Sequence, residues 1–477
     1  MNYRIIFHTL GWVLCIEAGC LLFPLLCALV YGENFMLYIF CMLLCLAFAL
    51  PLIIKQPKNK ALYAKEGFTI VGLAWIVMSL FGALPFYFSG YIPSFIDALF
   101  ESVSGFTTTG ASILSDVEAL PKSLLFWRSF THWIGGMGVL VFLVAILPLA
   151  GGENLHLIKA ESTGPAVGKL VPKIKSSAKW LYGMYIIMTL IQILLLLFGG
   201  LDLYEALTLT FGTAGTGGFG ILNSSCADYS SYVQIVITVF MILFGIDFTF
   251  YYLILMRRWK MIANADETKA YLSIILLSIV LITINCRDLF TSLGEAIKHS
   301  AFQVGSIITT TGYTTTDFDL WPEFSKTILV LLMFIGACAG STGGGIKVSR
   351  ILILLKSIVK QVRISTHPRS VVKITMNGRP IAHETIRAVN VYMAAYIAIF
   401  VVSMLVICLD NLDFTTNFTA IAATLNNIGP GLARVGPTQN FSVYSPLSTL
   451  VMSLDMLIGR LEIFPMLILF SPNAWKK

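Results

Sequence analysis

Four short segments of the chain combine threonine, asparagine and glycine in a way that suits the binding of a small cation. Each ends in glycine, which allows the backbone angles that turn carbonyl oxygens inward, and threonine hydroxyl groups add further oxygen ligands. Rings of such oxygens can replace the water around a dehydrated cation. The candidate ion-binding residues are Thr107, Thr108, Thr109, Gly110, Ala214, Gly215, Thr216, Gly217, Thr309, Thr310, Thr311, Gly312, Asn426, Asn427, Ile428 and Gly429.

These four filter segments belong to an internal repeat. Residues 100–110 read FESVSGFTTTG and residues 302–312 read FQVGSIITTTG, while TAGTGG stands at 213–218 and TLNNIGPG at 424–431. Their final glycines are 107, 95 and 117 residues apart, and each segment lies between a short amphipathic stretch and a long apolar run. The pattern predicts four like-oriented copies of span, re-entrant helix, loop and span. Such copies imply a pseudo-fourfold axis normal to a membrane, where a pore would lie.

The composition requires a lipid environment. Of 477 residues, 57% are hydrophobic and 12% are charged, whereas a soluble protein carries about 25% charged residues. The apolar runs lie at about 5–31, 35–54, 68–89, 123–150, 180–200, 231–256, 270–286, 325–355, 389–409 and 443–470. Since a spanning helix needs about 20 apolar residues, there is room for roughly ten. A soluble enzyme, a nucleic-acid binder and a disulfide-stapled secreted domain are excluded.

Four half-polar stretches between these runs are too short to cross a bilayer. They lie at 94–113, 202–221, 292–315 and 413–432. Such segments are tolerated at membrane depth where they are buried in protein or line an aqueous cavity. We therefore predict an all-α integral membrane protein with two extra N-terminal helices before the repeats. The expected units are 1–66, 67–158, 159–264, 265–375 and 376–477.

The basic residues predict the orientation of the chain. If the N-terminus is cytoplasmic, 25 of the 32 Lys and Arg residues fall on the cytoplasmic side, including those at both termini, as the positive-inside rule expects. Fifteen of the 25 acidic residues fall on the outer side, together with all four filter segments. A negative outer face concentrates cations, although depletion of acids inside explains part of the bias.

A glycine run in the third repeat predicts a break in a spanning helix. Residues 336–345 read GACAGSTGGG, and each internal glycine costs about 1 kcal/mol of helix stability relative to alanine. We expect an unwound loop inside the membrane, although a glycine run that lets helices pack closely is an alternative. The following GGGIK resembles a phosphate-binding loop only superficially, because the Gly-Lys-Ser/Thr sequence is absent.

Arg460 lies in the middle of the last apolar run. An arginine facing lipid at that depth costs about 2.5–3.5 kcal/mol on insertion scales, so it should face the pore or a partner acid. Glu462 and Asp455 are candidate partners for an ion pair. Asp247 is another buried acid that could serve, and its role stays open.

These motifs resemble the TrkH branch of a potassium transporter superfamily that also contains KtrB and plant HKT proteins. The supporting stretches are WRSFTHWIGGMGVLVFLVAILP at 127–148, IKAESTGP at 158–165, TAGTGGFG at 213–220, TTTGY at 309–313, NNIGPG at 426–431 and GRLEIFP at 459–465. The resemblance runs from end to end, and the two leading helices are similar to TrkH rather than KtrB. The fourth filter segment departs from the others because NNIG lacks their threonines.

The resemblance implies potassium uptake through a gated pore in the bacterial cytoplasmic (inner) membrane. It implies that the loop of Gly340, Ser341, Thr342, Gly343, Gly344 and Gly345 is the gate, and that Arg460 forms an electrostatic constriction below the filter. Sodium-permeable relatives replace the first filter glycine by serine, so Gly110 favours potassium. The resemblance also implies a homodimer and a separate cytosolic nucleotide-binding subunit of the TrkA type.

Two other classes of function are alternatives to a potassium pore. A sodium- or proton-coupled cation or solute transporter usually has inverted repeats and a midplane site, although ion coupling within a potassium pathway stays open. A membrane-embedded enzyme needs a nucleophile, a metal site or paired carboxylates, and none stands at useful spacing. The nine cysteines form no CxxC pair and the six histidines no HExxH. We expect no cofactor, only potassium as the transported ion.

Overall fold

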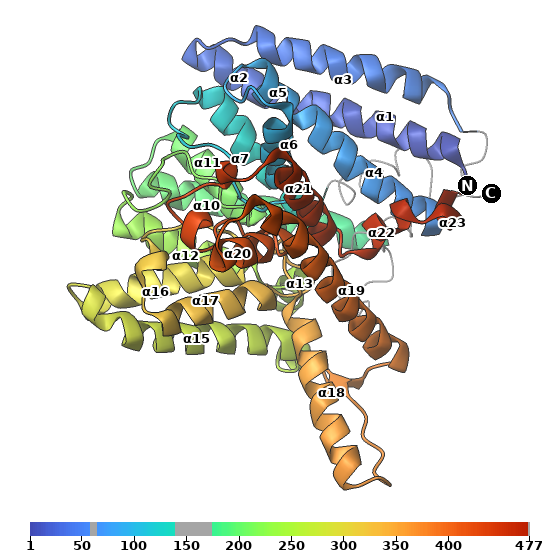
Figure 1. Cartoon of the computed structure of the whole chain (residues 1–477), viewed down its shortest axis with the longest axis vertical. Coiled ribbons are helices and arrows are strands. Elements are labelled where there is room, and N and C mark those ends of the chain that lie inside the picture. The colour runs from blue at the N-terminus through green and yellow to red at the C-terminus, as the bar shows by residue number, and fades with distance from the viewer. Residues whose placement is uncertain (58–63, 139–173, 476–477) are drawn as a thin grey trace.

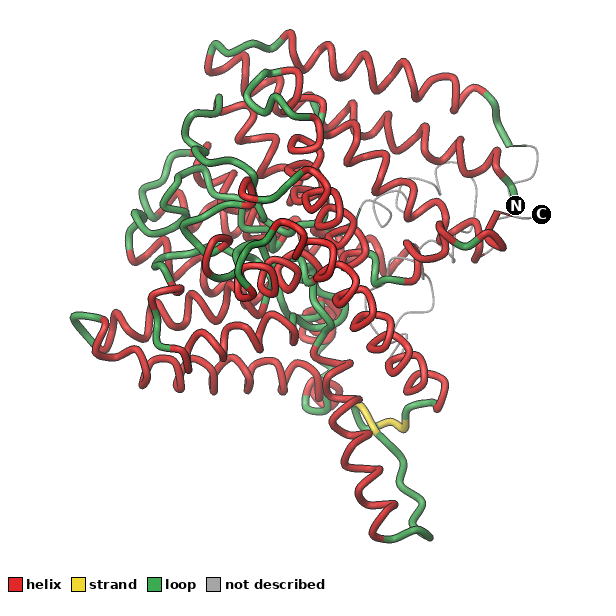
Figure 2. Tube along the Cα trace, viewed as in Figure 1, coloured by secondary structure: helices red, strands yellow, loops and turns green. Residues whose placement is uncertain are grey.

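The chain folds almost entirely into helices of differing length and direction (Figures 1 and 2). The computed structural model describes residues 1–57, 64–138 and 174–475. Within these residues the only strands are β1 (Thr375–Met376) and β2 (Arg379–Pro380), which pair as a small antiparallel hairpin. Short 3-10 helices occur as η2 (Arg287–Leu289), η3 (Phe318–Leu320), η4 (Cys408–Asp410), η5 (Ala433–Val435) and η6 (Phe441–Val443).

Two N-terminal spans lie side by side along one edge of the molecule (Figure 1). The first is built from α1 (Tyr3–Cys20) and α2 (Leu22–Tyr31), and the second is α3 (Met36–Ile54). Gly11 lets α1 approach α3 closely, because a methyl group in its place would lie 2.8 Å from the side chain of Ile53. Both helices stand outside the repeated units that follow.

Each of the four following units has a long first helix, a short re-entrant helix and a second helix. The first helices are α4 (Ala64–Gly82) continued by α5 (Leu84–Phe88), α10 (Ile174–Phe198), α15 (Asp266–Cys286) and α19 (His383–Ile407). The re-entrant helices are α6 (Phe95–Phe106), α11 (Leu203–Gly215), α16 (Leu293–Ile308) and α20 (Phe414–Leu425). The second helices are α7 (Lys122–Gly136), α12 (Ser231–Phe244), α17 (Glu323–Ile335) and α21 (Pro446–Arg460).

All four second helices stop after 13 to 15 residues. The chain continues in α13 (Phe248–Leu255) and α14 (Trp259–Ile262), in α18 (Val348–Thr366), and in α22 (Phe464–Phe470) and α23 (Pro472–Trp475). The axis bends by 89° between α12 and α13. The continuation of α7 lies outside the described residues. A break was predicted only in the third repeat, so the interruptions after α12 and α21 are findings of the structure.

Six helices in the described part of the chain are long and apolar enough to cross a membrane, or seven if the bent pair α12–α13 counts as one span. Ten apolar runs were predicted. The difference arises because the interrupted second helices are individually too short for the membrane thickness, which takes about 20 residues. A multi-pass, all-helical membrane protein is confirmed by these spans.

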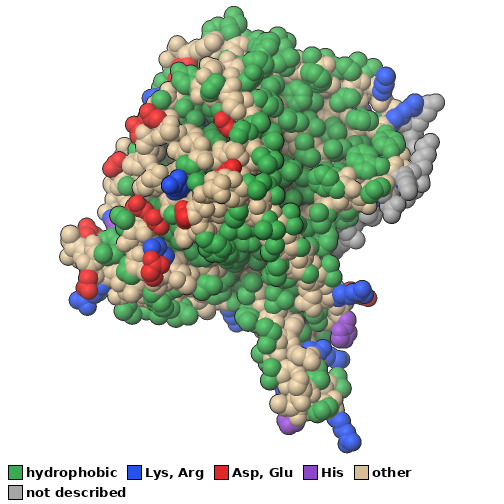
Figure 3. All heavy atoms as spheres, in the orientation of Figure 1, with side chains coloured by type: hydrophobic (Ala, Val, Ile, Leu, Met, Phe, Trp, Pro, Cys, Tyr) green, Lys and Arg blue, Asp and Glu red, His purple; other side chains and the backbone are tan. Residues whose placement is uncertain are grey.

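The surface in Figure 3 matches this reading. Apolar side chains cover the broad middle of the visible face. Large apolar residues such as Leu276 and Leu405 are exposed in the described chain. Acidic side chains gather towards the left edge, and basic ones lie near the chain termini and along the α18 protrusion. An apolar band between oppositely charged ends is the surface expected of a protein that spans a bilayer.

The predicted unit boundaries stay predictions. The boundary at 66 falls within the first turn of α4, and the boundary at 375 divides the short strand β1. The boundary at 158 lies outside the described residues.

Candidate functional site

The four re-entrant helices begin in the same way. A Ser or Asp side chain before each helix accepts a hydrogen bond from the backbone N–H three residues further on, which satisfies a donor that the helix start leaves free. The capping residues are Ser94, Asp202, Ser292 and Asp413, at donor–acceptor distances of 3.4, 2.6, 3.2 and 2.9 Å. The signal stands in the sequence as SFID, DLYE, SLGE and DFTT, and it could have located all four starts.

The same helices also end in the same turn. One residue of each turn has a positive φ, and these residues are Thr108, Thr216, Thr310 and Asn427, with φ of 56°, 57°, 60° and 56°. Its N–H donates to the carbonyl three residues back, and the next N–H donates to the carbonyl five residues back. This is the Schellman ending of a helix, in which the positive φ usually selects glycine. A β-branched threonine is strained there, and such strain concentrates at functional sites.

The turns correct the predicted register of the second filter segment. The glycines that stand two residues after the positive-φ residues are Gly110, Gly218, Gly312 and Gly429, and all four have positive φ themselves. The second segment is therefore 215–218, and Gly218 rather than Gly217 matches Gly110. Ala214 lies inside α11. Because TAGTGG contains two adjacent glycines, spacing alone could not decide between them, whereas the Schellman hydrogen bonds do.

The four filter segments close into a ring. A methyl group on each filter glycine would come within 3.0 Å of the backbone oxygen just before the filter glycine of the next repeat. The pairs are Gly110 with Gly217, Gly218 with Thr311, Gly312 with Ile428, and Gly429 with Thr109. Each repeat thus contacts the next in order, and the fourth returns to the first. Only glycine fits at these positions, and each one abuts a backbone carbonyl oxygen of the neighbouring repeat.

Different side chains hold the filter segments in place. The hydroxyl groups of Thr107 and Thr109 lie 2.8 Å apart, as do those of Thr309 and Thr311. The fourth segment uses an amide instead, since Nδ2 of Asn427 donates to Oγ1 of Thr109 at 3.0 Å. All of these side chains are buried. The fourth repeat therefore replaces the missing hydroxyl bond by one that reaches across to the first repeat.

A buried ion pair outside the filter was not anticipated from the sequence. Nε of Arg128 on α7 donates to Glu101 on α6 at 2.5 Å, and both side chains are almost fully buried. Glu101 also accepts from the N–H of Ile113 at 3.0 Å, and Arg128 donates to the carbonyl oxygen of Gly220 at 2.9 Å. The pair therefore joins a re-entrant helix to the chain that leaves two neighbouring filter segments.

His132 links the same two repeats below this pair. Its Nδ1 lies 2.7 Å from the carbonyl oxygen of Gly105, and the N–H of Phe219 donates to Nε2 at 3.2 Å. Because Nε2 accepts, Nδ1 carries the hydrogen and the ring is neutral. The ring is fully buried and fills the space beside Gly217. His132 therefore positions the backbone of the first and second filter segments.

The glycine run of the third repeat lies directly against the filter, as an irregular loop between α17 and α18. The N–H of Gly344 donates to Oγ1 of Thr310 at 2.6 Å. Methyl groups on Gly343 and Gly344 would lie 3.0 Å from the carbonyl oxygen of Thr309 and 2.6 Å from that of Asn426. Residues 340–345 thus contact the filter segments of the third and fourth repeats.

Arg460 lies beside this loop, as the last residue of α21. Its guanidinium donates to the carbonyl oxygen of Thr342 at 2.8 Å and to those of Gly135 and Gly136 at 2.5 and 3.1 Å. It therefore connects the loop of the third repeat to the end of α7 in the first.

The acids that were considered as partners for Arg460 have other contacts. Glu462 pairs with Arg350, and Asp455 accepts from the hydroxyl of Ser403 at 2.7 Å. Asp247 caps α13 by accepting from the N–H of Thr249 at 2.9 Å. Its carboxylate also lies against Gly340, where a methyl group would come within 2.6 Å.

The arrangement can bind a cation without a cofactor. Four helices direct their C-terminal ends, which carry partial negative charge, towards one ring of carbonyl oxygens. In the described part of the chain, no group of three or more His, Cys, Asp or Glu side chains is placed to hold a metal ion. The oxygen atoms near the ring belong to backbone carbonyls and threonine hydroxyls, groups that suit a weakly bound, mobile cation.

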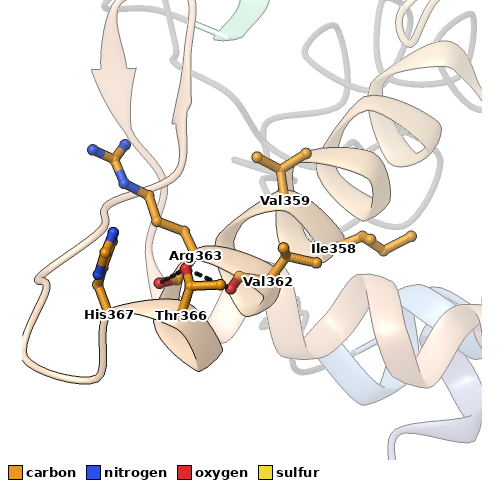
Figure 4. Close-up of a pocket in the computed structure, with 6 residues that line it drawn as sticks. All are labelled: Ile358, Val359, Val362, Arg363, Thr366 and His367. Carbon is orange, nitrogen blue, oxygen red and sulfur yellow. Dashed lines mark hydrogen bonds between the residues drawn. The ribbon is translucent and has the colours of Figure 1, made fainter.

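A second surface feature lies away from the ring. Helix α18 projects from the rest of the molecule (Figure 1) and exposes the apolar residues Leu355, Ile358, Val359 and Val362. Figure 4 shows a pocket on this helix, lined by Ile358, Val359, Val362, Arg363, Thr366 and His367. Nothing in the described chain covers this face.

Comparison with known proteins gives consistent matches along the whole chain. The TrkH family model, described as "Cation transport protein", matches residues 33–477. The "Trk system potassium uptake protein TrkH" of Escherichia coli K12 is 36% identical over 490 residues, covering 100% of both chains. TrkG of the same strain, also described as a Trk system potassium uptake protein, is 32% identical and covers 100% of this chain and 99% of its own.

A solved structure matches the fold as well. The crystal structure of the potassium transporter TrkH from Vibrio parahaemolyticus superposes with a TM-score of 0.88 at 33% sequence identity. The match covers 100% of each chain.

Proposed function

Because the chain belongs to the TrkH family of cation transport proteins, we propose that it carries potassium into the cell through a gated, potassium-selective pore. The observation that carries the proposal is the closed ring, in which each filter glycine abuts a carbonyl of the next repeat. A ring of carbonyl oxygens compensates a potassium ion for its lost water while binding it weakly enough for release.

The proposed pore needs no chemical step. A membrane potential of 100 mV is worth about 2.3 kcal/mol per charge, which supports roughly 45-fold accumulation at about 1.4 kcal/mol per decade. The acidic residues around the outer loops, such as Asp116 and Asp317, raise the local cation concentration at the entrance. Potassium thus reaches the filter from the acidic side and leaves past the glycine loop.

Residues 340–345 form the gate in this proposal, together with Arg460. Two features support that role: the loop contacts the filter backbone directly, and the Arg460 guanidinium places a positive charge beside the ion path. A fixed positive charge in a low-dielectric pathway repels a passing cation. In this proposal the gate opens when residues 340–345 and Arg460 move away from the pore axis.

The chain is proposed to lie in the bacterial cytoplasmic (inner) membrane with both termini in the cytoplasm. The basic residues near the termini and along α18 support this orientation. We also propose a homodimer, in which the apolar face of α18 packs against a second copy, and a separate cytosolic nucleotide-binding subunit of the TrkA type that moves the gate.

Rubidium uptake into proteoliposomes of the purified chain tests the proposal. Vesicles loaded with excess potassium should accumulate external rubidium, whereas vesicles loaded with excess sodium should not. Equal uptake in both would replace the selective pore by an unselective cation path. Absence of uptake, with the TrkA-type subunit and its nucleotide also supplied, would reject the pore.

A further inference from the structure

One carboxylate oxygen ties both ends of the gate loop together. Oε1 of Glu267, in the first turn of α15, accepts from the N–H of Ala339 at 2.7 Å and from the N–H of Ser349 at 3.0 Å. These donors stand just before and just after residues 340–345. The loop has no helical hydrogen bonds of its own, so contacts of this kind determine where it lies.

The neighbouring carboxylate makes matching contacts to the α18 protrusion. Oδ2 of Asp266 accepts from the N–H of Asn377, in the β1–β2 turn, at 3.1 Å and from Nζ of Lys356 on α18 at 3.2 Å. The N–H of Asp266 donates back to Oδ1 of Asn377 at 3.0 Å. Nζ of Lys356 also donates to the carbonyl oxygen of Thr375 at 2.8 Å. The start of α15 thus holds the hairpin as well as the loop.

We propose that the adjacent residues Asp266 and Glu267 couple the β1–β2 hairpin to the gate loop, with Glu267 as the positioning residue that holds the loop closed. This inference rests on the proposed gate. The two carboxylates share one helical turn, so a displacement of the hairpin that pulls on Asp266 also shifts Glu267. Losing the Glu267 contacts frees Ala339 and Ser349 together and releases both ends of the loop.

The location favours this role over a purely structural one. A carboxylate near a helix N-terminus is stabilised by the free N–H groups and the helix dipole. Either Asp266 or Glu267 alone would therefore be enough to stabilise the first turn of α15. The backbone donors that Glu267 binds belong to the loop and to the first turn of α18, not to α15.

Replacement of Glu267 by alanine tests the proposal in the full-length chain. Glu267→Ala should raise rubidium uptake by about tenfold, equivalent to about 1.4 kcal/mol of lost closed-state stability. Glu267→Gln should stay near the wild type, because the accepting oxygen survives in the amide. Glu384→Ala, which removes an exposed carboxylate from the first turn of α19, is the matched control and should change nothing.

A second readout does not depend on transport. Cys338 lies just before the gate loop and is fully buried. It is the only cysteine between Lys326 and Lys347, so cleavage after lysine gives a peptide that contains this cysteine alone. Modification of Cys338 by a small thiol reagent, quantified on this peptide, should be much faster in Glu267→Ala than in the wild type or Glu267→Gln. Asp266→Ala should speed it too, but should add nothing in a chain that already carries Glu267→Ala.

The outcomes separate the two hypotheses. If wild-type vesicles show selective uptake while Glu267→Ala matches them in flux and in Cys338 labelling, the coupling is wrong and the pore stands. If wild-type vesicles show no selective flux even with the TrkA-type subunit and its nucleotide supplied, but Glu267→Ala exposes Cys338, Glu267 positions the loop and the pore assignment fails. Full additivity of the Asp266 and Glu267 effects on labelling would overturn the link to the hairpin.

Discussion

At position 110, two independent constraints require glycine: its φ is +80°, and a side chain would overlap the carbonyl of Gly217 in the next repeat. We predict that Gly110→Ser widens or distorts the ring and raises the sodium-to-potassium permeability ratio. Competition of sodium with rubidium uptake measures this ratio. Gly218→Ser should behave in the same way, which tests the corrected register of the second filter segment.

Gly183→Ser is the matched control for these substitutions. Gly183 lies within α10, and the space where its side chain would stand is open. The serine should leave selectivity unchanged. A shift of equal size at both positions would contradict the assignment of the filter.

The buried pair of Glu101 and Arg128 carries a prediction about stability. Removing one member of a buried ion pair typically costs about 3–5 kcal/mol, because the other charge is left without compensation. Arg128→Met should therefore lower the thermal midpoint of the purified protein strongly, as followed by fluorescence in detergent. Combining it with Glu101→Leu should restore part of the loss, and a double variant no better than the single one would argue against the pair.

Residue types located the four Gly-bearing turns and the interrupted helix of the third repeat, but they did not reveal long-range contacts. TTTG and the glycine run could be recognised because a glycine with positive φ ends a helix and several glycines together interrupt one. The contact of Glu101 with Arg128 and those of His132 with Gly105 and Phe219 join residues 27 or more positions apart, and no local pattern encodes such pairings. The sequence pattern assigned Gly217 instead of Gly218 for a similar reason: the two glycines differ in φ, which residue type does not report.

At the scale of the element, each re-entrant helix depends on its cap. Hydrogen bonds from Thr416 lower the pKa of Asp413, so the cap contributes stability above the ordinary pKa and loses it as the pH falls through the folded value. Asp413→Ala should cost about 1 kcal/mol at neutral pH. The difference in thermal midpoint between wild type and variant should shrink as the pH falls below the ordinary Asp pKa of about 3.9. A difference that does not change with acidification would show that the ionised carboxylate adds nothing to the cap.

The broken second helices show where apolar periodicity fails as a guide. The run at 231–256 is apolar throughout, yet it bends by 89° where α12 gives way to α13. The break follows from tertiary contacts: the carbonyl oxygen of Gly245 accepts from the N–H of Cys338, just before the gate loop, and the N–H of Phe248 donates to the carbonyl oxygen of Gly340 within it. A pattern of hydrophobicity reports burial in lipid or protein, and it does not report hydrogen bonds made to another repeat.

For the whole molecule, the α18 protrusion predicts an oligomer. Val359→Asp places a charge on the exposed apolar face and should convert the dimer to monomers, as measured by light scattering coupled to size-exclusion chromatography. Gln361→Asp introduces the same charge at an exposed polar position of α18 and should leave the dimer intact. A monomeric wild type, or dimers in both variants, would remove this face from the interface.

The ring of filter glycines has a handedness with a genetic consequence. Each glycine presses on the repeat that follows it, never on its own carbonyl, so damage is displaced by one repeat. A substitution at Gly110 distorts the backbone at Gly217, and one at Gly312 distorts it at Ile428. Suppressor mutations should therefore arise among residues that pack around the next filter segment in the ring, rather than around the substituted one. Because the four repeats belong to one chain, the contact between each pair of neighbouring filter segments can change on its own. Asn427, which stands where the other three segments have threonine, is an example.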